Sequence, residues 1–389
     1  MKNRWKLLLV SFAVANARVA AQPAKVTTAQ LAQWSNAKTK TPEAQIYRLW
    51  QTYFNSKQRL LGAHIGDHSP YWVSDEQKKW PAYDLAGAYQ PSDGPAEIVS
   101  LKRVSAKPLR YEIAVRFVTK DSGTGSNGNR VAINSTTLVF AAVREGEAWR
   151  LANVLPSRTE HWHSEKVGTI TYWVDPKLKF NKARALQAVN FADSLAVAFQ
   201  VPKIAGLDYY VTSSVDVAQG ILGVESEVRY GTAGGFAKPA NRQIFSGDPT
   251  VGENYRHELV HEVLSQYGGY SLLGSEGIAT WLGGTLSLRY PDAVKRLNRY
   301  LDEHPSVTID SAIERTIPQV ESYVTGAVLG DMISRKGGIS GLKLFLSTYG
   351  MQKPIHETLT TIFGKSWKQV NIDWRAEVKR IATQRTPGS

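Results

Sequence analysis

The run His257-Glu258-Leu259-Val260-His261 contains the residue types that bind and use a divalent metal ion. His257 and His261 stand four residues apart, so on a helix both imidazoles project from one face toward a single ion. Glu258 lies beside them and is not needed as a ligand, which leaves its carboxylate free to act as a general base. The spacing therefore predicts a metal-binding helix, with zinc as the expected ion.

A third ligand is expected at Glu276, within residues 275–281, which we place at the start of a second helix. Two histidines and one glutamate leave the fourth tetrahedral position to water, as a catalytic zinc site requires. The small residues Gly277, Ala279 and Gly283 are predicted to lie along one side of this helix and to let it approach the metal helix closely. The alternative interpretation is that Glu276 is only a charge favoured by the helix dipole and that the two histidines are ordinary surface residues.

Local signals indicate where the metal helix begins and ends. The Asp-Pro-Thr sequence at residues 248–250 is predicted to start it, because Asp or Thr can cap free backbone N–H groups, and Thr250 with Glu253 fits a capping box. The glycine pair at residues 268–269 is the matching stop. The opposite, buried stripe of this helix is predicted to consist of Tyr255, Leu259 and Val263.

Around these helices, the C-terminal half of the chain shows strand patterns first and helix patterns afterwards. Strands are predicted at residues 169–174, 208–212 and 242–245, and an amphipathic helix over residues 181–199. Everything beyond Thr250 reads as helix. This order predicts an α+β arrangement in which a small sheet is followed by a helical subdomain.

The segment Gly234-Gly235-Phe236 is a candidate for the substrate-binding edge of that sheet. An exposed edge strand can pair with an extended peptide by β-augmentation. The same glycines are equally consistent with a bulge.

The N-terminal half combines one long helix, predicted over residues 42–57, with a series of strands. Strands are predicted at residues 97–103, 109–119, 131–143 and 148–154. A turn-rich segment covers residues 121–129, and a tight hairpin is predicted at Glu145-Gly146. One long helix followed by a curled antiparallel sheet resembles the NTF2-like fold.

The chain length suggests two domains, and a boundary near residues 156–165 separates residues 22–160 from residues 161–389. Within that boundary His161 and His163 are two residues apart, which on a strand puts both imidazoles on one face. A second metal site there would lack a carboxylate or cysteine partner. We therefore favour packed or exposed surface positions for both histidines.

The first residues have the order of a secretory signal peptide, with three cations, an apolar stretch over residues 7–15 and then small residues. Cleavage is expected after Ala21, so residues 1–21 are assigned to the signal. The apolar stretch is too short for a stable membrane anchor, and no later stretch approaches spanning length. We expect a bacterial periplasmic or secreted protein without an integral membrane segment.

The formal charge is +13, or +9 without the four cations of residues 1–21. Lys and Arg are spread along the chain without a dense basic run, so we interpret the charge as a solvated surface and expect no nucleic-acid partner. The chain has no cysteine. A disulfide framework is thereby excluded, and any metal must be held by His and carboxylate.

The run from His257 to His261, followed by Glu276-Gly277-x-Ala279, resembles the gluzincin metallopeptidases. The resemblance is specifically to the peptidase MA-like family, related to aminopeptidase N and thermolysin. It implies a zincin-like catalytic domain that hydrolyses peptide bonds with Zn²⁺ as cofactor and a peptide or protein as substrate.

The resemblance covers about residues 168–382, including the Tyr323-x-x-Gly326 helix. Two departures are visible. The interval from His261 to Glu276 is shorter than in thermolysin or aminopeptidase N. Residues 234–237 also lack the acidic residue by which aminopeptidases hold a free amino terminus, so aminopeptidase specificity is not expected.

The mechanism that follows assigns catalytic roles to two residues. Zinc would lower the pKa of its bound water and polarise the scissile carbonyl, while Glu258 would take the proton and pass it to the leaving amine. Tyr323, placed near the site by the resemblance, is the candidate donor to the oxyanion, and a packed aromatic residue is the alternative. A second function remains open, a catalytically inactive zincin-like envelope protein that binds ligands through its N-terminal domain.

Overall fold

The structure is a computed structural model that describes residues 26–58, 69–75, 96–119, 134–226, 234–268, 271–285 and 288–384. The predicted signal peptide at residues 1–21 and the predicted turn at residues 121–129 lie outside these ranges. Helices and strands are mixed in the described residues, as the expected α+β class requires. None of the described helices has the length and apolar character needed to cross a membrane.

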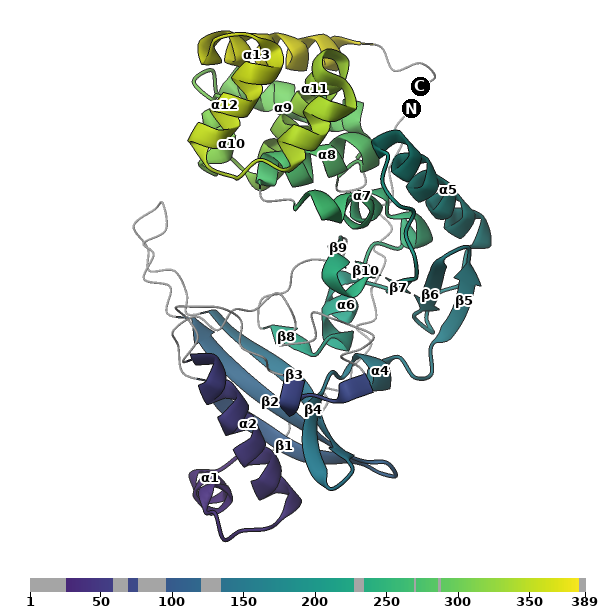
Figure 1. Cartoon of the computed structure of the whole chain (residues 1–389), viewed down its shortest axis with the longest axis vertical. Helices are drawn as coiled ribbons and strands as arrows, with labels where there is room; N and C mark the ends of the chain where they lie inside the picture. Colours follow the sequence, from purple (N-terminus) through teal and green to yellow (C-terminus); the bar gives the residue numbers. More distant parts are fainter. Residues whose placement is uncertain are drawn as a thin grey trace, which may run out of the picture.

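The first lobe packs helices against one face of an antiparallel sheet, at the bottom of Figure 1. Its elements are α1 (Thr28–Ser35), α2 (Pro42–Gln58), η1 (Ser69–Tyr71), β1 (Ala96–Ala106), β2 (Leu109–Thr119), β3 (Asn134–Glu145), β4 (Ala148–Ala152) and β8 (Val224–Ser226). The strands run in the order β1-β2-β3-β4, with β8 added alongside β3. The predicted helix over residues 42–57 is confirmed, and each predicted strand is found within a few residues of its predicted bounds.

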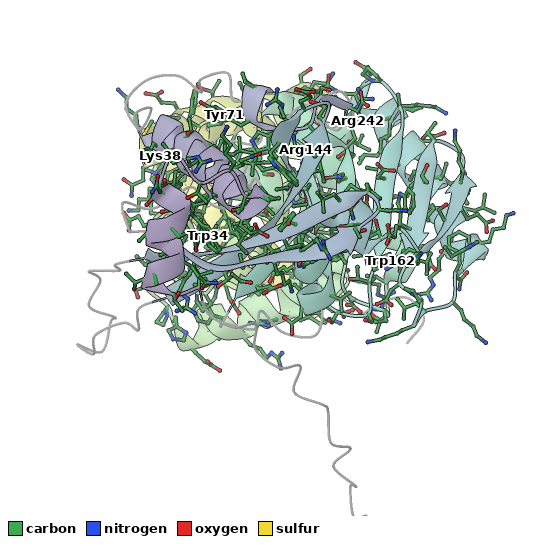
Figure 2. The ribbon with its side chains drawn as sticks, turned by 90° about the horizontal axis from the view of Figure 1, so that it is seen from below. Trp34, Lys38, Tyr71, Arg144, Trp162 and Arg242 are labelled. Atoms are coloured by element: carbon green, nitrogen blue, oxygen red, sulfur yellow. The ribbon has the colours of Figure 1, made fainter. Side chains whose placement is uncertain are left out.

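Alternation along the strands explains how this sheet builds a core. On β2 the side chains of Tyr111, Ile113, Val115 and Phe117 are buried, while the residues between them are more exposed. Trp50 of α2 stacks on Phe140 of β3, with ring centroids 5.2 Å apart. In the view from below, Trp34 lies between the first helices and the sheet, whereas Lys38 lies at the outer surface (Figure 2).

The second lobe begins with a sheet whose strands run in the order β5-β6-β7-β10-β9. Their bounds are β5 (His163–Val167), β6 (Ile170–Val174), β7 (Leu207–Val211), β9 (Gly235–Lys238) and β10 (Gln243–Ser246). The helix α5 (Lys182–Phe199) connects the parallel strands β6 and β7, and Asn181 caps it. Ala188, Ala192, Leu195 and Phe199 on the apolar face of this helix are buried, and Phe191 is half-buried.

Helices beyond residue 250 form the rest of this lobe, at the top of Figure 1. These elements are η3 (Gly252–Asn254), α7 (Arg256–Leu264), η4 (Ser265–Tyr267), α8 (Leu272–Gly283), α9 (Tyr290–Glu303), α10 (Ile309–Ile313), α11 (Gln319–Leu346), α12 (Gln352–Phe363) and α13 (Trp367–Thr383). Three short elements precede residue 250, namely α4 (Leu155–Arg158), which follows β4, then α6 (Val215–Ile221) and η2 (Pro239–Asn241). Gly338 interrupts α11 with φ 58°, and Gly364 ends α12 in the left-handed region.

The two lobes are joined by more than the polypeptide link at residues 156–165. After α6 the chain returns to the first sheet, where the N–H group of Val139 donates to the Gly223 carbonyl at 2.7 Å and β8 pairs with β3. Gly223 has φ 81°, and a Cβ there would lie 2.2 Å from the Val139 carbonyl oxygen. A side chain at residue 223 would therefore prevent this contact between the lobes.

The two histidines at the predicted boundary are surface residues. His163 begins β5, whereas His161 precedes the strand in a turn, so the expected strand placement holds for His163 alone. Their side chains are 89% and 65% exposed and lie near Glu160 and Glu165, respectively. Trp162 between them packs against the core of the first lobe (Figure 2). Neither histidine belongs to a cluster of metal-binding side chains among the described residues.

Candidate metal centre

Three side chains that the sequence assigns to a metal come together between α7 and α8. The Nε2 atom of His257 lies 3.1 Å from Oε2 of Glu276, and the Nε2 atom of His261 lies 3.6 Å from the same oxygen. The two imidazole rings are 4.9 Å apart between centroids. Each residue thus offers one donor atom, and the three atoms lie within 4.8 Å of one another.

These distances fit a tetrahedral zinc ion. Bonds of about 2.0–2.2 Å to nitrogen and oxygen place two ligands of such an ion about 3.4 Å apart. The measured separations of 3.1 and 3.6 Å bracket that value. A His₂Glu donor set also leaves a position open for water or substrate.

The start of α7 differs from the prediction. The helix begins at Arg256 without a side-chain cap, and the short turn η3 precedes it. Glu253 does not form a capping box with Thr250, because its buried carboxylate accepts from the N–H group of Asn181 at 2.6 Å and pairs with Arg184. Because Glu253 contacts the start of α5, its side chain is not available for the predicted capping box.

The far end and buried face of α7 are largely as predicted. Gly268 adopts φ 85° and ends the helical segment. Leu259 and Val263 are buried against the core. Tyr255 is the exception, because it precedes the first helical turn with ψ 84° and its ring lines the cavity instead of continuing the stripe.

Glu276 lies inside α8 and not at its start. The helix is capped by Ser271, whose hydroxyl accepts from the Gly274 N–H group at 2.8 Å, so Glu276 falls in the second turn. The predicted helix start was wrong because this cap lies five residues upstream. With its oxygen directed at two imidazoles, Glu276 is better explained as a ligand than as a charge placed for the helix dipole.

Glycines bring α8 close to two helices, one on each side. A Cβ on Gly283 would lie 2.4 Å from the backbone nitrogen of His257, whereas a Cβ on Gly277 would lie 2.4 Å from the backbone of Gly326 in α11. The prediction that Gly277, Ala279 and Gly283 share one side is thus wrong for Gly277. Six residues correspond to about 600° of helical rotation, which separates the directions of residues 277 and 283 by about 120°.

Hydrogen bonds on the outer nitrogens orient both imidazoles. The Nδ1–H group of His257 donates to the Gly284 carbonyl at 2.8 Å, and Nδ1 of His261 lies 3.2 Å from the Ser275 hydroxyl. A proton on Nδ1 leaves the lone pair of Nε2 free for a metal ion. Sequence reasoning missed both partners. The position of Ser275 directly before Glu276 was a usable signal, whereas the Gly284 carbonyl gave none.

The two carboxylates in the site differ in their affinity for protons. Burial raises the pKa of Glu258, although the neighbouring histidines oppose this, and its carboxylate accepts from the Ala237 N–H group. Burial would also raise the pKa of Glu276, but the contacts of its carboxylate with His257 and His261 outweigh this effect and hold that pKa well below its usual range. Glu276 is therefore the permanent anion, and Glu258 is the better proton acceptor.

A cavity of about 770 Å³ opens in front of these groups. All the remaining predicted site residues line it, namely Gly234, Gly235, Phe236 and Tyr323. Glu258 and Glu276 are the acidic residues in its lining, and no Lys, Arg or Asp from the described ranges joins them.

The strand β9 forms one wall of the cavity and lies at the edge of its sheet. Its pairing with β10 runs without a register shift, so the bulge interpretation of the glycines was wrong. Gly247 donates to the Gly234 carbonyl at 2.7 Å, and by the alternation of an antiparallel ladder Gly235 and Ala237 direct their backbone groups to the open edge.

Tyr323 lies in the second turn of α11, and its ring stacks on His257 with centroids 6.4 Å apart. The side-chain amide of Gln319 donates to its hydroxyl oxygen, which leaves the hydroxyl hydrogen free to donate elsewhere. Burial and the charge of Glu276 raise the pKa of Tyr323, so the hydroxyl keeps its proton at neutral pH.

No known protein-family profile matches the chain, and a search of curated proteins finds no relative.

Proposed function

We propose that this protein is an exported, zinc-dependent metallopeptidase of the gluzincin type, similar to the peptidase MA-like family. The first lobe would be NTF2-like and the second zincin-like. The observation that carries the proposal is the convergence of one donor atom each from His257, His261 and Glu276 within 4.8 Å, with the carboxylate of Glu258 beside them.

A zinc ion bound there would supply Lewis acidity, lowering the pKa of water and polarising a carbonyl group. Glu258 accepts the proton of the attacking water and delivers it to the nitrogen of the leaving amine. Its raised pKa supports both steps, because the same group must first take and then release a proton near neutral pH. Tyr323 donates its hydroxyl hydrogen to the carbonyl oxygen as negative charge develops there.

The substrate is an extended peptide that pairs with β9. Gly235 and Ala237 present backbone groups at the open edge, although the Ala237 N–H group is already bonded to Glu258. Apart from Glu258, Glu276 and the two histidines, the described lining contains no ionisable group that is charged at neutral pH, so it offers no Lys or Arg to hold a terminal carboxylate. This favours cleavage within a peptide rather than at an end.

The test combines metal analysis with digestion of a peptide library. Purified wild-type protein should contain about one zinc ion per chain and cleave peptides, whereas Glu258→Gln should keep the zinc and lose cleavage by about 100- to 10,000-fold. His257→Ala is the matched control that should lose both. Stoichiometric zinc without cleavage would favour the ligand-binding function, and absence of zinc after loading would overturn the site.

A further inference from the structure

Tyr255 is a residue of the cavity wall to which the proposed mechanism gives no role. It connects η3 to α7, two residues before His257, and its ring centroid lies 6.3 Å from that imidazole. The ring lines the same cavity as the metal-binding side chains.

The backbone and ring of Tyr255 are held in place from two directions. Its N–H group donates to the hydroxyl of Tyr209 at 2.9 Å, and that hydroxyl donates to the Gly252 carbonyl at 2.8 Å. A Cβ on Gly235 would lie 2.7 Å from an edge carbon of the Tyr255 ring, so the ring rests directly against β9 where a side chain would exclude it. The position of the ring is therefore fixed by its surroundings.

The hydroxyl of Tyr255 is a proton-bearing donor without a described partner. A tyrosine hydroxyl keeps its proton at neutral pH and can donate it in a hydrogen bond. Within the ranges that the structure describes, no hydrogen bond to this hydroxyl is present, and it is not among the fully buried polar atoms. It is thus available to a ligand in the cavity.

Tyr255 and Tyr323 reach the cavity from different elements. Tyr255 precedes α7 and its ring rests against Gly235 of β9, whereas Tyr323 lies on α11 and its ring stacks on His257. Tyr255 accordingly lies at the edge strand, and Tyr323 at a metal-site imidazole. Their hydroxyls are suited to different parts of one substrate.

We infer that Tyr255 is a substrate-binding residue, whose hydroxyl donates to a backbone carbonyl oxygen of a peptide lying along β9. A peptide that pairs with Gly235 at the open edge lies next to the residue on which the Tyr255 ring rests. Every peptide unit carries a carbonyl, so this contact recognises extended backbone and is independent of side-chain sequence. The inference rests on the proposed peptidase function.

The experiment compares Tyr255→Phe with Tyr323→Phe on a peptide that the zinc-loaded wild type cleaves. Loss of one hydrogen bond in substrate binding should raise KM about 3- to 10-fold for Tyr255→Phe and leave kcat within about 3-fold. Tyr323→Phe should lower kcat instead. Tyr300→Phe, on α9 and away from the cavity lining, is the matched control.

A binding measurement separates recognition from turnover. In the Glu258→Gln background, fluorescence anisotropy with the intact labelled peptide should show the same 3- to 10-fold loss of affinity, about 1 kcal/mol, when Tyr255→Phe is added. Zinc content should be unchanged. Unaltered KM and affinity, or a fall in kcat alone, would overturn the inference while leaving the peptidase intact. No cleavage by zinc-loaded wild type would instead overturn the proposed function, and this inference with it.

Discussion

Each imidazole of the proposed metal site is oriented by a hydrogen bond of a different kind. His257 relies on a backbone carbonyl, which no substitution of a side chain removes directly, whereas His261 relies on the hydroxyl of Ser275. Partners of this kind set the tautomer and orientation of a ligand, so their loss weakens metal binding without removing a ligand.

Ser275→Ala should therefore weaken zinc binding by about 10- to 100-fold while leaving the fold intact. Competition with a chelator measures the effect. Ser194→Ala, a helical serine whose hydroxyl bonds to the Asn190 carbonyl on α5, is the control and should bind zinc as the wild type does. Equal zinc affinity in Ser275→Ala would show that the hydroxyl does not orient His261.

Lys238 on β9 gives a pH-dependent prediction for stability. Burial lowers its pKa from 10.5 to about 8, so folding is opposed by a protonated lysine below pH 8. Between about pH 8 and 10.5 the unfolded chain binds more protons than the folded chain, and stability should gain from this residue as pH rises. Lys238→Met should be more stable at pH 7 and lack this gain. Urea unfolding at pH 7, 8.5 and 10 tests it, and parallel curves for both proteins would contradict it.

At the residue scale, spacing was enough to predict that the side chains of His257, His261 and Glu276 come together. The four-residue spacing of the histidines and the carboxylate that follows them are local patterns, and local patterns can be read directly from a sequence. Tyr255 was misplaced because helical periodicity was extended over a residue that lies outside the helix. Its actual surroundings, Gly235 and Tyr209, are distant in sequence and follow only from the fold.

Among the elements, α8 tolerates the least change in its packing. It carries Glu276 and lies between α7 and α11, approaching each at a glycine. Close packing of this kind fixes the position of Glu276 relative to His257 and His261, because neither α7 nor α11 can move toward or away from α8 independently.

Gly277→Ala should disturb this arrangement. The new Cβ would lie 2.4 to 2.8 Å from backbone atoms of Gly326, and overpacking of this kind costs about 1–3 kcal/mol. Because Glu276 is the preceding residue, zinc affinity should fall as well. Urea denaturation and chelator competition provide the two readouts.

Gly220→Ala in α6 is the matched control, since a Cβ there meets no atom within 4 Å. Replacing glycine at such an unstrained helical position should be neutral or stabilise by about 0.4–1 kcal/mol. If both variants had the stability of the wild type, the close approach of α8 to α11 would not be a constraint.

Sequence patterns predicted long elements better than short ones. The strand β2 has the predicted bounds, and α2 and α5 each differ from their predicted bounds by one residue. A long segment repeats its hydrophobic pattern several times, which makes the pattern easy to recognise. The predicted start of α7 was wrong because the nearest acidic residue, Glu253, bonds to the start of α5 instead. The three-residue strand β8 carries no pattern long enough to detect.

For the whole molecule, the contact between the lobes depends on stacked aromatic rings. Phe245 of β10 belongs to the second sheet by hydrogen bonding, but its side chain is part of the core of the first lobe. It stacks on Tyr210 at 4.8 Å and on Phe236 at 4.9 Å between centroids. The cores on the two sides of the β10 strand are therefore mechanically linked.

Phe245→Ala should lower the free energy of unfolding by about 3–5 kcal/mol. It should also weaken the cooperation between lobes, so that tryptophan fluorescence and far-ultraviolet circular dichroism report separate transitions. Phe345→Ala, equally buried but within the helical layer, should be comparably destabilising while affecting the second lobe alone. Coincident transitions in Phe245→Ala would argue against this linkage.

The strand β8 also limits how the two lobes can be exchanged during evolution. A chain that began at residue 161 would carry Ala218, Ile221 and Leu222 without the core that buries them, together with a strand that has lost its neighbour. Unpaired edges and bared apolar groups promote aggregation. If gene shuffling replaced the first lobe, the new domain would have to pair with β8 as β3 does. The two lobes are therefore expected to be inherited as one unit.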